Sequence, residues 1–349
     1  MSTRVENNSA NEIATSCVAA TSICKRFGAV EALQQVTLDV GAGQTVALIG
    51  ANGSGKSTLL RTIFGICRPD RGTVSVHGID PFVDPKRLYA FAKYLSQQFS
   101  LDHEMRGDET LKLFARLNGI PGRKINQAIS DVAQQFGLVD FLSRRIAKWS
   151  GGMKQRLHLA ICLLGESESE SGESKLMLLD EPTSNLDHSG KMDFWTWSKT
   201  YTEKGGTILL TTHDLKNVER FASKVILLDK GKVLLDETPQ RIVQQHGRPV
   251  IFVTVGEHQF SQETKASLEA LASVSEIDFS DNQLAIVLED GDCKDATIVS
   301  ELEKHNVPVE SYRREVGLAA AYYLLAGKRL TNSQPTKRNR GSGKGRKHQ

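Results

Sequence analysis

Two kinds of hydrophobic pattern alternate along this chain. Segments with apolar residues at helical spacing begin near Lys56, cover most of 107–145, and recur after Ser150 and around 189–203. Short, continuous apolar runs stand between them, and runs of this length are typical of buried β-strands. These runs lie at 17–24, 36–40, 45–49, 176–180 and 207–211. Strands that alternate with helices predict an α/β core.

The pattern restarts after about residue 245. Strands are expected at 249–255, 274–279, 284–288 and 307–312, with helices at 261–273 and 293–304 and a closing segment at 316–326. This β-α-β-β-α-β order is compatible with a small ferredoxin-like α+β domain. The predicted organisation is a polar leader over 1–15, a first domain over 16–246, a second over 247–327, and a polar tail over 328–349.

Composition and charge narrow the class of protein. The 349 residues are 39% hydrophobic and 24% charged, which is typical of a globular protein and excludes a collagen-like, coiled-coil or wholly disordered chain. The net charge of +3 conceals an asymmetry, because eight basic and no acidic residues lie between Lys328 and Gln349. The remaining 36 Lys and Arg residues face 41 Asp and Glu residues, so the body carries −5. A globally basic nucleic-acid binder is therefore disfavoured.

Cysteines and apolar segments indicate the compartment. The five cysteines are scattered and form no C-x-x-C pair, so neither a disulfide scaffold nor a zinc finger is expected. We expect reduced thiols in a cytoplasmic protein. Residues 1–14 lack the apolar core of a signal peptide. The sequence has no stretch of 18 consecutive apolar residues, the length that a membrane-spanning helix needs. If the protein serves a membrane process, we expect it to do so through a partner.

A glycine-rich stretch follows the apolar run 45–49 and precedes a predicted helix. Its glycines allow backbone N–H groups to wrap a phosphate at the positive end of that helix. Lys56 is expected to reach the β- and γ-phosphates, and the Ser57 hydroxyl to ligate Mg²⁺. The stretch fits G-x-x-x-x-G-K-[ST] and consists of Gly50, Ala51, Asn52, Gly53, Ser54, Gly55, Lys56 and Ser57, with Thr58 next to it.

Two carboxylates end the apolar run 176–180. On a parallel sheet the carboxyl ends of the strands face the ligand crevice, so Asp180 is placed to hold Mg²⁺, directly or through water. Glu181 can then polarise the attacking water as a general base. The simpler interpretation is that both carboxylates are surface acids at the end of a strand. The phosphate loop 125 residues upstream favours the catalytic interpretation over it.

Further motifs complete a known arrangement. Residues 148–156 contain Ser150, Gly151 and Gly152, and this centre resembles the L-S-G-G-Q signature of the ATP-binding cassette family. Four other residues match motifs of that family in order: Phe27 at the adenine-stacking position, Gln97 in the Q-loop, Asp187 in the D-loop and His213 as the switch histidine. The resemblance covers residues 16–246 and implies a P-loop NTPase with a RecA-like core, an antiparallel β-subdomain and a helical subdomain.

The resemblance also implies a mechanism and its cofactors, ATP and Mg²⁺. Two cassettes close head to tail around two ATP molecules, and residues 150–152 of one meet the γ-phosphate bound by the other. Gln97 and His213 then sense the γ-phosphate and the attacking water, and Gln97 joins Ser57 and Asp180 around the metal. Such catalysis is mostly positioning and electrostatic stabilisation. Closure is driven by ATP and released by hydrolysis.

Some residues depart from the family pattern. Phe27 stands where a Tyr is common, so adenine stacking survives without the hydroxyl. Trp149 and Met153 replace the Leu and Gln of the signature. Lys56, the two carboxylates and His213 are all present, so we expect an active ATPase.

A single cassette of this kind implies a separate permease and a second cassette. Residues 247–327 resemble the C-terminal extension of exporter subunits. Within them, 317–325 is only loosely similar to the L-E-D-x-F helix that often ends this extension. Two roles for this domain stay open: bracing the dimer without touching substrate, or contacting substrate. A permease helix is expected between the Q-loop and segment 99–148, where Phe99, Leu101 and Met105 are candidate contacts or core residues. The subunit is thus expected on the cytoplasmic face of the membrane.

Other classes and two polar segments stay open. A soluble cassette acting on the ribosome or nucleic acid is the alternative, disfavoured because such proteins carry two cassettes or long coiled coils. A non-hydrolytic scaffold is disfavoured by the catalytic set. The acidic stretch 165–175 reads as a solvated surface insertion, with regulation as a second interpretation. The basic tail is either solvated, attracted to anionic lipid, or bound to nucleic acid.

Overall fold

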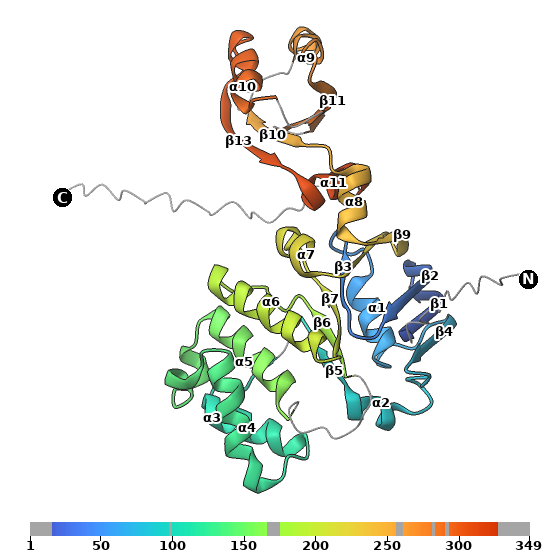
Figure 1. The fold of residues 1–349 in the computed structure, drawn as a ribbon, viewed down its shortest axis with the longest axis vertical. Coiled ribbons are helices and arrows are strands. Elements are labelled where there is room, and N and C mark those ends of the chain that lie inside the picture. Colours follow the sequence, from blue (N-terminus) through green and yellow to red (C-terminus); the bar gives the residue numbers. More distant parts are fainter. Residues whose placement is uncertain are drawn as a thin grey trace, which may run out of the picture.

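A six-stranded sheet forms the centre of the larger part of the molecule (Figure 1). The computed structural model describes residues 16–97, 100–165, 175–255, 261–280, 283–289 and 293–326. The predicted leader, Phe99, most of the acidic stretch and the basic tail lie outside these residues. The order of the sheet is β5 (Ala92–Leu95), β6 (Leu176–Asp180), β7 (Thr207–Thr211), β3 (Thr45–Ile49), β8 (Lys224–Asp229) and β9 (Lys232–Glu237).

The strands of this sheet explain the continuous apolar runs. All pairs from β5 to β8 are parallel, and only β9 runs antiparallel at the edge. Every residue of β3, β6 and β7 is buried. Strands of a parallel sheet that is covered on both faces have no solvent side, so their sequence shows no alternation.

A second, antiparallel sheet covers one face. Its order is β2 (Val30–Gly41), β1 (Ser16–Phe27) and β4 (Arg71–Val76). Its apolar residues share one hydrophobic core with α1 (Lys56–Ile63), α2 (Pro85–Phe91) and inward residues of the central sheet such as Leu48 and Leu178.

Helices cover the other face. These are α3 (Gly107–Leu117), α4 (Gly122–Gln135), α5 (Gly151–Leu163), α6 (His188–Glu203) and α7 (Leu215–Phe221). The expectation that 107–145 is mostly helical is confirmed, but regular helix ends at Gln135. Beyond it come two 3₁₀ turns, Val139–Phe141 and Ile146–Lys148, which carry the chain back toward Gly107 and position Trp149.

A smaller sheet builds the accessory unit at the far end of the molecule (Figure 1). Its order is β11 (Val274–Ser280), β12 (Gln283–Leu288), β10 (Val250–Val255) and β13 (Val309–Glu315), with all neighbours antiparallel. The helices α9 (Gln262–Glu269) and α10 (Asp295–Lys304) pack on one face of it.

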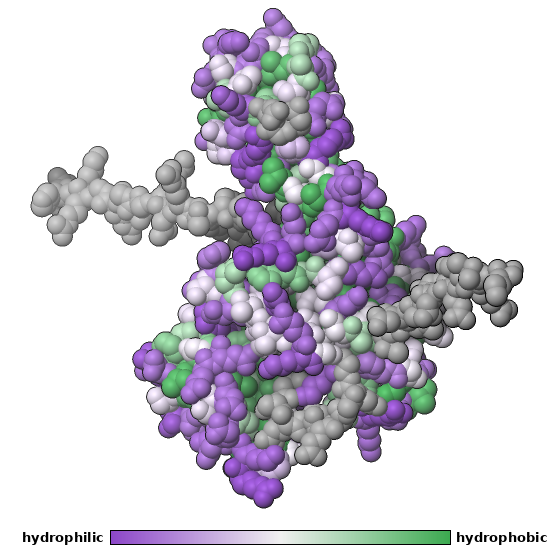
Figure 2. All heavy atoms as spheres, in the orientation of Figure 1, coloured by the Kyte–Doolittle hydropathy of each residue, from purple (hydrophilic) through white to green (hydrophobic). Residues whose placement is uncertain are grey.

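The last helix joins the two parts. One side of α11 (Gly317–Ala326) packs on the accessory sheet through Ala320, Tyr323 and Leu324. Its other side, with Leu318, Ala321 and Tyr322, belongs to the core of the larger part and contacts α7 and α8 (Pro239–His246). In Figure 2 hydrophobic residues reach the surface at this neck.

The predicted α/β fold class is confirmed, and several boundaries move. The strand expected at 17–24 extends over Ser16–Phe27, and the helix expected at 261–273 ends at Glu269. The strand expected at 307–312 begins at Val309 and continues to Glu315. The first case reflects antiparallel pairing, which carries β1 well past the apolar residues that predicted it.

Candidate functional site

The phosphate loop turns from β3 into α1 as the sequence predicts. Gly55 is the residue before the first helical one and has φ +105°, a conformation that L-residues with a Cβ rarely adopt. A Cβ there would lie 2.5 Å from the carbonyl oxygen of Ala32. Glycine is therefore required at this point both by the backbone angle and by the close approach of a neighbouring strand.

Lys56 lies beneath this loop and is nearly buried. Its Nζ donates hydrogen bonds to the carbonyl oxygens of Gly50, at 2.8 Å, and Ala51, at 3.0 Å. Burial lowers the pKa of Lys56, and Glu181 and Asp180 oppose that shift. The ammonium group thus lies at the centre of the loop and is hydrogen-bonded to backbone carbonyl groups. An anionic phosphate can replace these carbonyl groups as the acceptor.

Asp180 and Glu181 are held in place by the neighbouring strand. Asp180 is paired with Thr211 in the sheet, and the Thr211 hydroxyl donates to Asp180 Oδ1 at 2.7 Å. The backbone N–H of Glu181 donates to the same hydroxyl at 2.8 Å. Asp180 Oδ2 is buried with no hydrogen-bond partner among the described residues, which is an unusual state for a carboxylate oxygen and fits a cation ligand.

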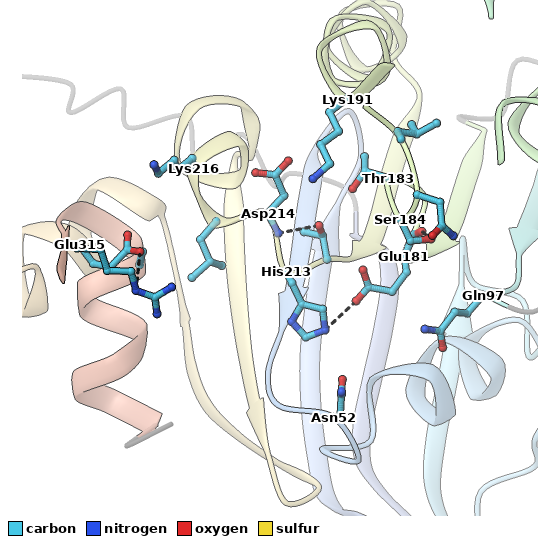
Figure 3. A pocket seen from close by; sticks show the side chains of 16 residues that line it. Asn52, Gln97, Glu181, Thr183, Ser184, Lys191, His213, Asp214, Lys216 and Glu315 are labelled. Atoms are coloured by element: carbon cyan, nitrogen blue, oxygen red, sulfur yellow. Dashed lines mark hydrogen bonds and ion pairs between the residues drawn. The ribbon is translucent and has the colours of Figure 1, made fainter. Parts of the chain in front are cut away.

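Glu181 and His213 face each other across the site (Figure 3). The distance between Glu181 Oε1 and His213 Nε2 is 3.2 Å. Burial raises the pKa of Glu181 from 4.5 to about 7, with Lys56 opposing the shift. Burial, followed by the charge of Lys56, lowers the pKa of His213. A carboxyl group that titrates near neutral pH is suited to accept a proton from water.

Two adjoining cavities surround these groups. One, of about 410 Å³, is lined by the phosphate loop, Ser57, Thr58 and Asp180. The other, of about 570 Å³, is lined by His213 and the segment 183–186. Asn52, Gln97 and Glu181 line both, and Figure 3 shows Gln97 across the cavity from His213. The structure thus brings together the phosphate loop, the two carboxylates, Gln97 and His213.

Other predicted residues lie apart from these cavities. Phe27 is 53% exposed at the end of β1, with Lys25 Nζ 5.6 Å from its ring centre. Ser150 caps the N-terminus of α5, and its hydroxyl accepts from the N–H of Met153 at 3.2 Å. Gly151 is exposed and Gly152 partly buried. In a single chain the signature therefore faces outward.

Asp187 has a local partner of its own. Its Oδ1 accepts from the N–H of Gly190 at 3.0 Å, so it caps α6, and from Arg156 at 3.2 Å. These bonds lower the pKa of Asp187. The carboxylate is thereby held on the exposed end of α6 beside the helix that the signature begins.

Sequence reasoning missed several residues of the site. Thr211 was noted only as part of the strand before His213, although the pairing of two predicted strand ends was a signal for it. Arg313, Glu315 and Ala319 of the accessory unit also line the larger cavity, and nothing local in the sequence announces them. Lys191 of α6 lies there as well.

The fold and site define an ATP-binding cassette of the P-loop NTPase class. The ABC transporter family matches residues 33–184. The daunorubicin resistance ATP-binding protein DrrA2 of Streptomyces coeruleorubidus is 28% identical over 319 residues, 91% of this chain and 97% of that protein. The Nod factor export ATP-binding protein I of Rhizobium sp. (strain N33) is 32% identical over 237 residues, 67% of this chain and 75% of that protein.

A solved structure of an ATP-binding subunit of an ABC transporter has the same fold. Its TM-score is 0.58 with 29% sequence identity, over 66% of this chain and 92% of that one. The chain therefore belongs to the ABC transporter family. It is an ATP-binding, ATP-hydrolysing subunit of a transporter. Within the described residues no helix is long and apolar enough to cross a membrane.

Proposed function

We propose that this subunit drives the export of a drug-like small molecule and acts as one of two cassettes. The observation that carries the proposal is the length of the match to DrrA2, which takes in the accessory unit as well as the cassette. That relative is named for daunorubicin resistance, so the substrate class is the part of the proposal that rests on it. A solved dimeric structure of an ATP-binding cassette, 25% identical to this chain, supports pairing of two copies.

In the proposed site the phosphate loop binds the β- and γ-phosphates of ATP. Its backbone N–H groups and Lys56 supply positive charge, and Phe27 stacks on the adenine. Ser57, Asp180 and Gln97 are the residues to hold Mg²⁺, which supplies charge neutralisation on the phosphates. The unpartnered Asp180 Oδ2 fits this role. A site with one carboxylate suits Mg²⁺, because that ion takes its other ligands from phosphate and water.

Hydrolysis in the proposed mechanism depends on Glu181 and His213. Glu181 accepts a proton from the attacking water, and its raised pKa keeps it basic enough to do so at neutral pH. His213, 3.2 Å away, orients that carboxylate and contacts the γ-phosphate. Residues Ser150, Gly151 and Gly152 of the second cassette complete the site with helix N–H groups, and Asp187 contributes from the facing D-loop.

The permease contact is proposed for the groove beside the Q-loop. Met105 is partly exposed there, whereas Leu101 is 9% exposed and so acts in the core. Docking on a permease places the subunit at the cytoplasmic face of the membrane.

Steady-state hydrolysis tests the site. We expect Mg²⁺-dependent ATPase activity in the wild type, and Glu181→Gln should bind ATP, lose turnover, and elute as an ATP-dependent dimer in size-exclusion chromatography. Lys56→Ala is the matched control and should fail to bind ATP. Undiminished turnover in Glu181→Gln would remove Glu181 from its role as base.

Drug accumulation tests the substrate class. The chain and its permease, identified by co-purification from membranes, should lower doxorubicin accumulation in a drug-sensitive host, and the Glu181→Gln variant should not. Equal accumulation with both, while the wild type hydrolyses ATP, contradicts drug export and leaves the ATPase intact.

A further inference from the structure

The switch histidine is built into the start of helix α7. His213 stands two residues before Leu215, where α7 begins, and Asp214 caps that helix. The Asp214 side chain is bound by Asn217 Nδ2 at 2.8 Å, and the N–H of Asp214 donates to the Thr212 hydroxyl at 3.1 Å. The position of α7 therefore determines where the His213 ring lies relative to the phosphate loop.

Helix α7 is held from the other side by the accessory unit. Glu219, in the last turn of α7, accepts a hydrogen bond from the backbone N–H of Leu318 at 2.7 Å. That N–H belongs to the first turn of α11, where N–H groups lack helical partners and a negative charge is favourable. Residues 99 positions apart are thus joined where α11 meets α7.

Gly317 makes this contact possible. Its φ is +63°, and a Cβ built on it would collide with the Glu219 carboxylate. Apolar packing also joins the two helices beside this contact. Leu318 and Tyr322 of α11 share a buried core with Leu215 and Val218 of α7. The start of α11 is therefore shaped around the carboxylate of Glu219.

The accessory unit also reaches the cavity that contains His213. Arg313 and Glu315 of β13 and Ala319 of α11 line it together with His213 and Asp214. Figure 3 shows Glu315 at the side of this cavity that lies toward α11. A shift of β13 and α11 against α7 therefore changes the cavity wall and the helix that carries the histidine at the same time.

We propose that Glu219 is a positioning residue for ATP hydrolysis, which holds His213 in place by tying α7 to the accessory unit. The inference rests on the proposed role of His213. Phosphate binding is not expected to depend on Glu219, because the phosphate loop lies between β3 and α1 and Phe27 on β1. The signature of the proposal is a fall in kcat at unchanged KM for ATP.

The test uses the full-length protein. Glu219→Ala should lower kcat about 3- to 30-fold while KM for ATP stays within twofold. Glu219→Gln keeps a carbonyl acceptor at the same reach and should recover at least half of the wild-type kcat. Gly317→Ala perturbs the same contact from the partner side and should resemble Glu219→Ala. The control is Glu269→Ala on α9, whose carboxylate pairs with Lys265 on the same exposed helix face, and its kcat should not change.

His213→Ala separates this inference from the function it rests on. If Glu219 acts through His213, adding Glu219→Ala to His213→Ala should cause no further loss in single-turnover hydrolysis. Wild-type kcat in Glu219→Ala beside an impaired His213→Ala overturns the positioning role alone, as does a raised KM at unchanged kcat. Undiminished turnover in His213→Ala overturns the proposed function of the histidine itself.

Discussion

Burial of the Glu181 carboxyl predicts that this residue destabilises the nucleotide-free protein at alkaline pH. Its side chain is 12% exposed, and its pKa rises from 4.5 to about 7 in the fold. Between these two values the folded state holds a proton that the unfolded state has released. Stability must therefore fall as the pH rises through this window, and the loss is complete above pH 7.

The magnitude follows from the same two values. A difference of about 2.5 pH units corresponds to about 3 kcal/mol at roughly 1.4 kcal/mol each. Gln has nearly the same shape as Glu and does not titrate, so Glu181→Gln removes this loss. Part of this loss has already occurred at pH 5, so the free energy of unfolding of the variant should exceed that of the wild type by about 2.5 kcal/mol more at pH 8 than at pH 5. In a domain of this size that equals a melting-temperature difference of several degrees.

The assay is thermal unfolding in EDTA without nucleotide at pH 5, 6, 7 and 8. Glu203→Gln is the control, because its carboxylate is 62% exposed, and its difference from the wild type should not change with pH. A difference between Glu181→Gln and the wild type that stays constant from pH 5 to pH 8 would refute the reasoning from burial.

Two further substitutions test single contacts. Phe27→Ala should weaken ATP binding about 3- to 10-fold in isothermal titration calorimetry, since an exposed aromatic stack is worth about 0.5–1.5 kcal/mol. Phe27→Tyr should bind ATP as well as the wild type. If Phe27→Ala binds ATP with wild-type affinity, the adenine lies elsewhere. Thr211→Val keeps the side-chain shape but leaves the Glu181 N–H and one Asp180 oxygen without their partner. Chemical denaturation should therefore report that the free energy of unfolding falls by about 1–3 kcal/mol. Thr211→Ser retains the hydroxyl and should lose less stability; an equal loss in both variants would argue for packing alone.

Much of the cassette was predictable because its signals are local. The strand before the phosphate loop, the glycines of the loop and the helix at Lys56 lie within twenty residues, and each has its own physical cause. The central strands were predictable for a similar reason, since burial on both faces leaves a continuous apolar run. The edges were not: β1 extends to Phe27 because pairing with β2 continues where its own apolar residues stop.

The sequence by itself determined which groups this protein has for chemistry: a loop for phosphates, a base, a cation ligand and a histidine, each marked by its neighbours in the chain. Only the tertiary structure decided how these groups are held. Thr211 fixes both carboxylates because two parallel strands are in register, and Glu219 meets Leu318 because α11 packs on two cores at once. Contacts between residues far apart in the chain depend on packing, and packing leaves no pattern at either residue alone.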